Sequence, residues 1–307
     1  MWTSKAPSNI ALIKYMGKKE GNIPENISLS YTLEKFTTEV ALEEHQKKDI
    51  FINDIGLNEN EIRRFLSHLN YIKDLTNFKG YFKIASKNNF PRSAGIASSA
   101  SSFAALTMCA FKAISDIKNV SSPSVQEMSS ISRRGSGSSC RSFFSPWCVW
   151  DGEKAEKIDI SINKLLHDVV LVDSGLKKVS SSEAHKLVQT SLLIDGRSNR
   201  AKNRFDRLVY ALNNNQWNIA YQICWEEFFD MHALFETSVP HFGYISSETM
   251  FVLSELRKFW ENNNDGPLVT IDAGSNVHLL WKNDREYLRS SFKKSLAENN
   301  FFDVKFS

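Results

Sequence analysis

The sequence of 307 residues lacks the features that mark several protein classes. Its four cysteines form no CxxC pair and no closely spaced set, so neither a disulfide framework nor a zinc site is expected, and a reducing cytoplasm suits them. No apolar run approaches the roughly 18–20 residues of a membrane span. The N-terminus lacks the apolar stretch and cleavage site of a secretory signal. We therefore expect a cytoplasmic protein with no membrane partner.

Charge of one sign is not in large excess either. The chain has 38 Lys and Arg against 35 Asp and Glu, a formal net charge of +3, and no long block of like charge. A dedicated nucleic-acid binder usually concentrates its positive charge, so this class is disfavoured. There is also no internal repeat and no Pro/Gly-rich linker. At about 150 residues per domain, the length suits one large domain or two ordinary ones.

The first half of the chain mixes short strands with helices. The expected strands are short, apolar and bounded by polar residues or glycine: Ile10–Ile13, Ile50–Asn53, Tyr81–Ala85 and Val169–Asp173. Helices are expected over about Ser99–Ile117 and Pro123–Arg134, the second with Pro123 at its first helical position.

The second half, from about Ser180, has longer amphipathic helices. Val252, Leu256, Phe259 and Trp260 follow the spacing of one helix face. Two strands are expected around the tight segment 272–276: Leu268–Ile271 and Val277–Trp281. The pattern indicates an α/β half joined compactly to an α+β half, with the boundary at about 178/179.

The first candidate binding segment runs from Asn89 to Ala100, after an expected strand. Its small residues let the backbone close around an anion, and the free N–H groups of the following helix would point at that anion. Ser98 and Ser99 add hydroxyls for a phosphate or a magnesium ion. An ordinary capped turn has the same composition, so this loop by itself does not establish an anion-binding site. It does not match the Walker pattern, which excludes a P-loop NTPase.

A second candidate runs from Arg133 to Ser142 and combines glycines, hydroxyls and arginines. Such a segment can form an anion nest, in which Arg141 makes a bidentate contact to a carboxylate or phosphate. Its many serines also suit a flexible linker. The apolar segments that follow, Phe143-Phe144 and Trp147–Trp150, favour a folded nest.

Other signals are weak by themselves. Lys14 and Lys18 follow a strand, where lysines are usually solvated, and most Asp residues placed like Asp272 only brace a turn. The seven histidines show no metal-binding spacing, so no protein metal site is predicted. We expect His232 and His278 to be packed rather than catalytic.

In order, these segments resemble those of the GHMP kinase superfamily, and more narrowly those of the mevalonate diphosphate decarboxylase family. That family opens with APxNIAxxKYWGK, which residues 6–18 match except for Met16 in place of Trp. Its phosphate loop NNFPxAAGLASSA, its nest GSGSACRS and its turn FDAGPNA correspond to residues 88–100, 135–142 and 271–277. Four matches in the same order and spacing make the resemblance specific.

The resemblance implies a two-domain α+β GHMP kinase fold with the active site in the cleft between the domains. Residues 1–178 would form a ribosomal-protein-like α/β domain, and residues 179–307 a ferredoxin-like α/β domain. The implied reaction converts mevalonate 5-diphosphate and ATP, with Mg²⁺, to isopentenyl diphosphate, ADP, phosphate and carbon dioxide. Relatives are commonly homodimers, and no nucleic-acid partner is expected.

By motif position, the resemblance assigns three catalytic residues. Asp272 would abstract or orient the hydroxyl proton, Lys14 would lie beside it, and Arg141 would hold the carboxylate. We expect Asp272 to stay ionised. The implied substrate-binding residues are Tyr15, Met16, Gly17, Lys18, Arg63, Ser136, Gly137, Ser138, Ser139, Cys140 and Ser191. Arg64 competes with Arg63 for its role. The implied ATP-binding residues are Gly95, Ile96, Ala97, Ser98 and Ser99.

The chain departs from the family pattern near the expected substrate side. Besides Met16, Ser275 replaces a Pro, and segment 227–233 keeps only the His-Ala of the family's DSNxxHA stretch. Segment 239–241 keeps one Pro of a PP-containing loop. Two alternatives therefore stay open: a decarboxylase of mevalonate 5-phosphate, and a GHMP small-molecule kinase that stops at phosphoryl transfer.

The joint presence of Lys14, Arg141 and Asp272 favours decarboxylation over simple kinase action, and it disfavours a catalytically inactive scaffold. An alternative from another functional class is a nucleic-acid-binding module that contacts phosphates through Arg133, Arg134 and Arg141. That module would bind with a steep salt dependence. The near-neutral, dispersed charge of the chain argues against it.

Overall fold

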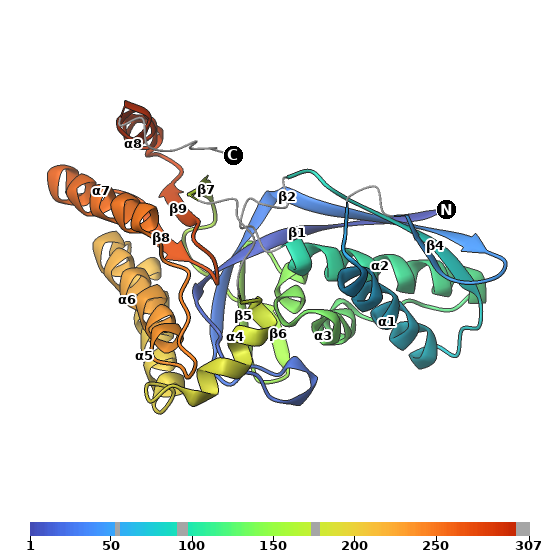
Figure 1. Cartoon of the computed structure of the whole chain (residues 1–307). Coiled ribbons are helices and arrows are strands. Elements are labelled where there is room, and N and C mark those ends of the chain that lie inside the picture. The colour runs from blue at the N-terminus through green and yellow to red at the C-terminus, as the bar shows by residue number, and fades with distance from the viewer. Residues whose placement is uncertain (53–55, 91–97, 173–178, 299–307) are drawn as a thin grey trace.

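The computed structural model describes residues 1–52, 56–90, 98–172 and 179–298. The strands of its N-terminal sheet are β1 (Trp2–Ile13), β2 (Ser28–His45), β3 (Ile50–Ile52), β4 (Tyr81–Asn88), β5 (Trp147–Asp151) and β6 (Lys154–Lys157). Three helices pack on one face of this sheet (Figure 1): α1 (Glu59–Leu75), α2 (Ser98–Lys118) and α3 (Val125–Gly135).

The long strand β2 organises the N-terminal sheet. The strand order is β3-β4-β2-β5-β6, and β1 pairs antiparallel with β2, with register shifts after Pro7 and Ala11. The two halves of β2 pair with β4 and β5. Leu42, Ile84 and Leu106 are fully buried between this sheet and α2, and their removal from water is the main force that holds the helices on the sheet.

A second, smaller sheet has the antiparallel order β7-β9-β8. Its strands are β7 (Leu165–Val170), β8 (Leu268–Ile271) and β9 (Val277–Lys282). The accompanying helices are α4 (Ser181–Leu187), α5 (Arg197–Asn213), α6 (Trp217–Glu236), α7 (Ser247–Asn263) and α8 (Glu286–Glu298). Strand β7 precedes the predicted boundary at 178/179 but pairs with β9. The boundary stays a prediction, and a division by sheet would fall between β6 and β7.

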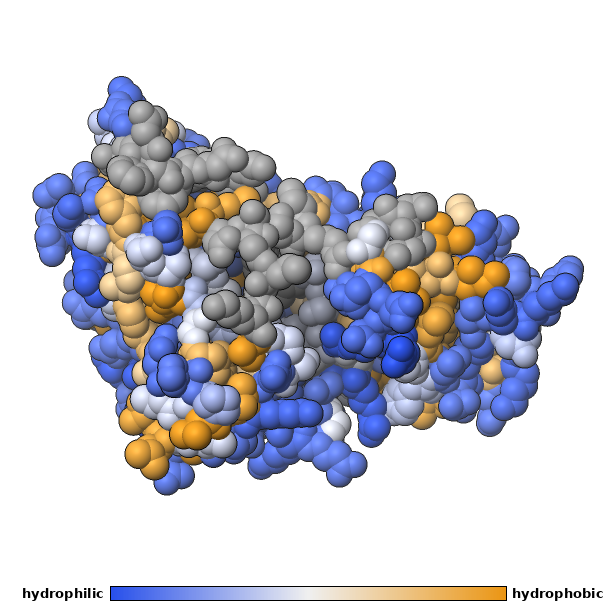
Figure 2. All heavy atoms as spheres, viewed as in Figure 1, coloured by the Kyte–Doolittle hydropathy of each residue, from blue (hydrophilic) through white to orange (hydrophobic). Residues whose placement is uncertain are grey.

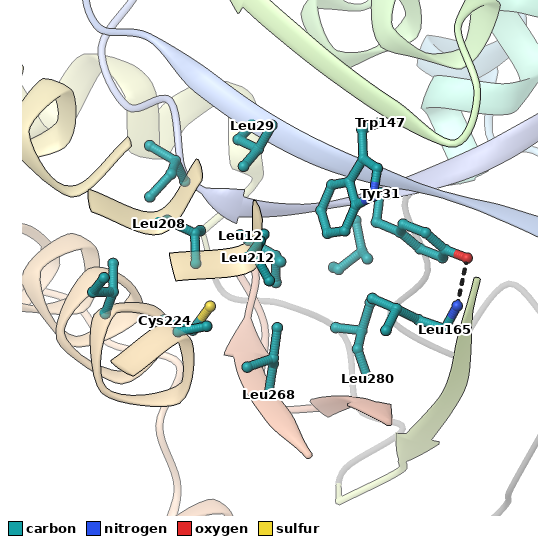
Figure 3. Close-up of a cluster of buried hydrophobic side chains, with 14 of the residues drawn as sticks. Leu12, Leu29, Tyr31, Trp147, Leu165, Leu208, Leu212, Cys224, Leu268 and Leu280 are labelled. Carbon is teal, nitrogen blue, oxygen red and sulfur yellow. Dashed lines mark hydrogen bonds between the residues drawn. The ribbon is translucent and has the colours of Figure 1, made fainter. Parts of the chain in front are cut away.

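A shared hydrophobic core joins the two sheets. Figure 3 shows side chains of β1, β2 and β5 pointing toward side chains of α5, α6, β8 and β9. Leu12, Leu208 and Leu280 are fully buried there. The backbone N–H of Leu165 donates to the hydroxyl of Tyr31 over 2.9 Å, which links β7 to β2. The halves are therefore held together over a continuous apolar surface.

The expected elements have counterparts, but several bounds differ: β1 begins at Trp2 rather than Ile10, and β4 continues to Asn88 rather than ending at Ala85. The central strand β2 was not expected. Helix α3 begins at Val125 rather than Pro123, because Ser124 and Glu127 form a capping box that sets its first turn. Strand β7 covers Leu165–Val170 rather than 169–173, because its pairing with β9 ends where β9 begins. Position 173 lies outside the described residues.

Hydrophilic residues cover most of the face seen in Figure 2, and the hydrophobic residues exposed among them form separate groups. Within the ranges that the structure describes, none of the helices combines the length and the hydropathy needed to cross a membrane.

Candidate active site

Two strands from opposite ends of the chain meet where the predicted catalytic residues lie. Lys14 directly follows β1, and Asp272 directly follows β8. The hydroxyl of Thr270 donates to the carbonyl oxygen of Ala11 over 3.1 Å, which ties the two strands together just before their ends. The Lys14 ammonium and the Asp272 carboxylate form an ion pair there.

Only one partner of this ion pair, Lys14, is fully buried. The side chain of Lys14 is 3% exposed and that of Asp272 is 31% exposed. Burial lowers the pKa of Lys14, against the opposing effect of Asp272. Burial alone would raise the pKa of Asp272, but Lys14, His278 and Arg141 outweigh it and hold the pKa below its usual value. Asp272 is therefore ionised at neutral pH, as predicted, and its carboxylate is accessible to a ligand.

Arg141 is fixed beside this pair by aromatic rings. It lies in the 3₁₀ segment Gly137–Phe143 and is buried. Its guanidinium lies 5.4 Å from the ring centre of Tyr15 and 5.9 Å from that of Trp150, and it donates to the hydroxyl of Ser28. Cation–π contacts of this kind stabilise a guanidinium that is partly removed from water. Arg141 is thus a fixed cation next to the Lys14–Asp272 pair.

The predicted nest lies between Arg141 and the start of α2. The Ser136 hydroxyl donates to that of Ser99 over 3.3 Å, so two segments distant in the chain face each other. A side chain at Gly137 would lie 2.9 Å from the Tyr15 hydroxyl and 3.2 Å from the Trp150 ring. Glycine is therefore required at this position for the nest to close.

Lys18 adds a further cation next to Tyr15. Its ammonium lies 5.8 Å from the Tyr15 ring centre. Burial, assisted by Arg64, lowers the pKa of Lys18 to about 8. The opposite side of Tyr15 stacks on His185, with ring centres 4.9 Å apart, and His185 Nδ1 accepts the backbone N–H of Gly17 over 3.2 Å.

A small cavity of about 50 Å³ opens at the N-terminus of α2. Its lining includes Arg64, Ser98, Ser99 and Ser102, together with the apolar rings of Phe65 and Phe103. Serine hydroxyls next to a helix N-terminus suit a phosphate group.

Lys14 and Arg141 lie close enough to the Asp272 carboxylate to lower its pKa, and Lys18 and Arg64 lie close to each other. Together these four cations give the site a positive charge that would attract a polyanion. In the described ranges, no three His, Cys, Asp or Glu side chains are grouped to hold a metal ion. Any magnesium at this site would be bound largely by ligand phosphates.

A comparison with models of known protein families identifies the family of this chain. The family model described as "Diphosphomevalonate decarboxylase-like N-terminal domain" matches residues 6–161, which is 156 of the 307 residues. The chain belongs to the diphosphomevalonate decarboxylase family.

Relatives in this family match the chain over most of its length. The diphosphomevalonate decarboxylase of Saccharomyces cerevisiae is 31% identical over 92% of this chain and 78% of its own. A solved mevalonate diphosphate decarboxylase from Legionella pneumophila is 47% identical over 96% of both chains, with a TM-score of 0.92. The solved protein MDDEF, in complex with MVAPP, AMPPCP and magnesium, is 30% identical over 96% of this chain and 92% of its own, with a TM-score of 0.87.

Not every residue predicted from the decarboxylase motifs lies at the site. The Met16 side chain is 3% exposed and packs in a core cluster with Ala184 and Phe235, and its N–H donates to Asn26 Oδ1. Ser191 is buried and its hydroxyl pairs with that of Thr237 over 2.6 Å. Both predicted roles lack a supporting side-chain contact, because apolar packing and local hydrogen bonds already satisfy the two side chains.

Within the nest, Ser139 and Cys140 point into the protein. The Ser139 hydroxyl bonds to the Ser136 carbonyl and to the Ser132 hydroxyl, and burial raises the pKa of the Cys140 thiol to about 12. These side chains support the nest from behind, whereas Ser138 is partly exposed and the Ser136 hydroxyl faces Ser99. Residues 95–97 of the predicted ATP loop lie outside the described residues.

Of the two competing arginines, Arg64 faces the site. Its guanidinium donates to the carbonyl of Gly135 over 3.0 Å, lies 5.3 Å from the Phe103 ring centre and lines the cavity. Both arginines are exposed, but Arg63, one position earlier on α1, does not line that cavity. Neighbouring positions on a helix point about 100° apart, so only one of the two can face the nest.

Three residues at the site were missed by the sequence analysis. Asn26 bonds to the backbone of both Lys14 and Met16. Arg197 and Glu227 bond to the carbonyl oxygen and the N–H of Lys14, respectively. No local sequence pattern reports these contacts, since they join segments up to 213 positions apart. Glu227 had appeared only as a departure from the family pattern.

Arg64 and Arg63 provide a matched pair of variants. Arg64→Ala is expected to weaken binding of inorganic diphosphate about tenfold, because a charged hydrogen bond contributes roughly 1.5–3 kcal/mol. Arg63→Ala should leave this affinity nearly unchanged. Isothermal titration calorimetry of both variants at one ionic strength is the measurement. Equal losses in the two variants would contradict the assignment of Arg64 to the site.

Proposed function

We propose that this chain catalyses the ATP-dependent decarboxylation of mevalonate 5-diphosphate to isopentenyl diphosphate, with release of ADP, phosphate and carbon dioxide. The observation that carries the proposal is the Lys14–Asp272 ion pair beside the fixed guanidinium of Arg141. A phosphoryl transfer needs an oriented hydroxyl, and a decarboxylation needs a held carboxylate. This group of residues provides for both.

The related protein MDDEF, in complex with MVAPP, AMPPCP and magnesium, supports a diphosphate substrate and a nucleotide with Mg²⁺. The residues of this chain fit such a nucleotide. The cavity at the start of α2 combines the hydroxyls of Ser98 and Ser99 with the guanidinium of Arg64 and the ring of Phe103. We assign a phosphate of the nucleotide to the serine hydroxyls at the start of α2, since a helix N-terminus favours negative charge. When bound, ATP with Mg²⁺ supplies the phosphoryl group that makes a tertiary hydroxyl a leaving group.

Asp272 accepts the hydrogen bond of that hydroxyl and takes its proton late in the transfer. A carboxylate of low pKa is a weak base, but phosphoryl transfer depends more on orientation and charge compensation than on a strong base. Lys14 keeps Asp272 ionised and offsets the negative charge that gathers around it. Arg141 holds the substrate carboxylate, whose C–C bond electrons form the double bond as phosphate leaves.

Lys18, Tyr15 and the nest residues Ser136 and Ser138 bind the diphosphate of the substrate in this proposal. The position of Lys18 over the Tyr15 ring supports that role. Arg64 takes the place that the sequence analysis gave to Arg63. The sum of these positive charges matches two phosphate-rich molecules in one site.

We further propose that the protein acts in the cytoplasm, since its four cysteines are unpaired and buried. A homodimer and a two-domain division at 178/179 remain part of this proposal through the family resemblance. The alternatives are a decarboxylase of mevalonate 5-phosphate and a kinase that stops at phosphoryl transfer.

The deciding experiment measures carbon dioxide and ADP from purified protein with ATP, Mg²⁺ and, in parallel, mevalonate, its 5-phosphate or its 5-diphosphate. Release of carbon dioxide with the 5-diphosphate alone is expected. Release with the 5-phosphate would move the assignment to the sister activity. ADP without carbon dioxide would identify a kinase and would overturn the role of Arg141.

The role of Asp272 is tested by Asp272→Asn. Turnover should fall by at least about a thousandfold, because the acceptor of the hydroxyl proton is lost from a preorganised site. Binding of ATP, followed by calorimetry, should be largely retained, since Asp272 does not line the nucleotide cavity. Loss of ATP affinity together with turnover would point instead to a structural role for Asp272.

The pKa of Lys18 predicts a pH dependence. Because this pKa is lowered to about 8, Lys18 is protonated below pH 8 and loses its charge above it. For an anionic substrate, kcat/KM is therefore expected to fall as the pH rises through about 8. In Lys18→Arg the charge persists, so this fall should move to higher pH. An unchanged profile in Lys18→Arg would assign the titration to another group.

A further inference from the structure

The backbone of Lys14 is held by side chains from the C-terminal half of the chain. The pairing of β1 with β2 ends at Ile13, so strand hydrogen bonds do not extend to Lys14. Its N–H donates to Glu227 Oε1 over 2.9 Å. Its carbonyl oxygen accepts from Arg197 Nη2 over 2.7 Å and from Asn26 Nδ2 over 2.9 Å. The N–H of Lys14 is thus bound by an acidic side chain, and its carbonyl oxygen by a basic one.

Arg197 and Glu227 also form an ion pair with each other. Their side chains are 2% and 0% exposed. The second oxygen of Glu227 accepts from Arg197 and from Arg204, each over 3.1 Å. Asp230, one turn further along α6, binds the same two arginines and Arg200 but does not bind Lys14.

A buried ion pair is a costly way to stabilise a fold, since packed apolar residues of similar size are often as stable or more so. We propose that Arg197 and Glu227 are positioning residues that fix the backbone of Lys14 and so aim its ammonium at Asp272. The inference rests on the proposed function, because it concerns the same pair of residues.

Helix α6 supports both members of the Lys14–Asp272 pair. Glu227 binds the N–H of Lys14, and His232 Nε2 contacts the carbonyl oxygen of Asp272 over 3.2 Å. Because that carbonyl is an acceptor, His232 donates to it. The distance between Lys14 and Asp272 is therefore set by one rigid element that contacts the backbone of each. This arrangement explains why acidic and basic residues are buried where β1 ends.

Glu227→Gln is the test, and Asp230→Asn is its matched control. Both variants remove one negative charge from the same group of arginines, but only Glu227 touches Lys14. In Glu227→Gln the side-chain NH₂ group would face the N–H donors of Arg197. The side chain is then expected to move, so that the hydrogen bonds holding the Lys14 backbone are lost. We expect kcat to fall about a hundredfold with KM nearly unchanged, the size of effect that a displacement of about 1 Å at a reacting group produces. Asp230→Asn should retain most of the wild-type kcat.

A readout that does not need turnover is the acetylation of lysines by acetic anhydride, followed by peptide mass spectrometry. Lys14 should react faster in Glu227→Gln than in Asp230→Asn, while Lys18 should react equally in both. If the wild type releases no carbon dioxide, the proposed function fails, and the labelling still tests the positioning.

Equal losses of kcat in the two variants, or equal labelling of Lys14, would overturn the proposal and leave only a structural ion cluster. Should Glu227→Gln not fold, Glu227→Asp keeps the charge but withdraws the carboxylate from Lys14 by one methylene. It is expected to fold and to show the same loss of kcat with little change in KM. Wild-type kcat in Glu227→Asp, or failure of both variants to fold, would also overturn the assignment.

Discussion

The ion pair between Lys14 and Asp272 is the interaction on which the rest of the site depends. It joins residues 258 positions apart, each the first residue after a strand. A charge pair of this kind loses solvation when it is buried, so it persists only where the surrounding structure holds both partners in place. Here the hydroxyl of Thr270 ties the two strands together, and a continuous apolar core joins the halves of the chain behind them.

The electrostatics of the site follow from that arrangement. Lys14 and its neighbours hold Asp272 ionised, and Lys18, Arg64 and Arg141 add positive charge to the site. Lys18 and Arg141 both contact the ring of Tyr15, which helps to stabilise a cation that is partly removed from water. A rigid cationic site needs little rearrangement when charge develops on a ligand, which is the most effective form of electrostatic catalysis.

Local patterns predicted the elements that carry this site. Strand signals around segment 272–276, the helix that becomes α2 and the amphipathic helix α7 are confirmed, because short-range spacing of apolar residues and caps determines them. The start of α3 was two residues off, since the capping box of Ser124 and Glu127 competes with the Pro123 signal. Strand β7 was misplaced because its bounds depend on β9, more than a hundred residues away.

The residues of the site likewise divide into those that the sequence predicted and those that only the structure identified. The segments around Lys14, the nest and Asp272 could be recognised from the sequence because each resembles a continuous family motif, although Lys14 and Asp272 were weak signals by themselves. Which side chains face the ligand could not be recognised, and the structure packs Met16 inward and turns Arg64 rather than Arg63 toward the nest. Arg197 and Glu227 carried no motif at all. Their contacts with the Lys14 backbone exist only because the packing of α5 and α6 against β1 brings distant segments together, and no pattern along the chain encodes that proximity.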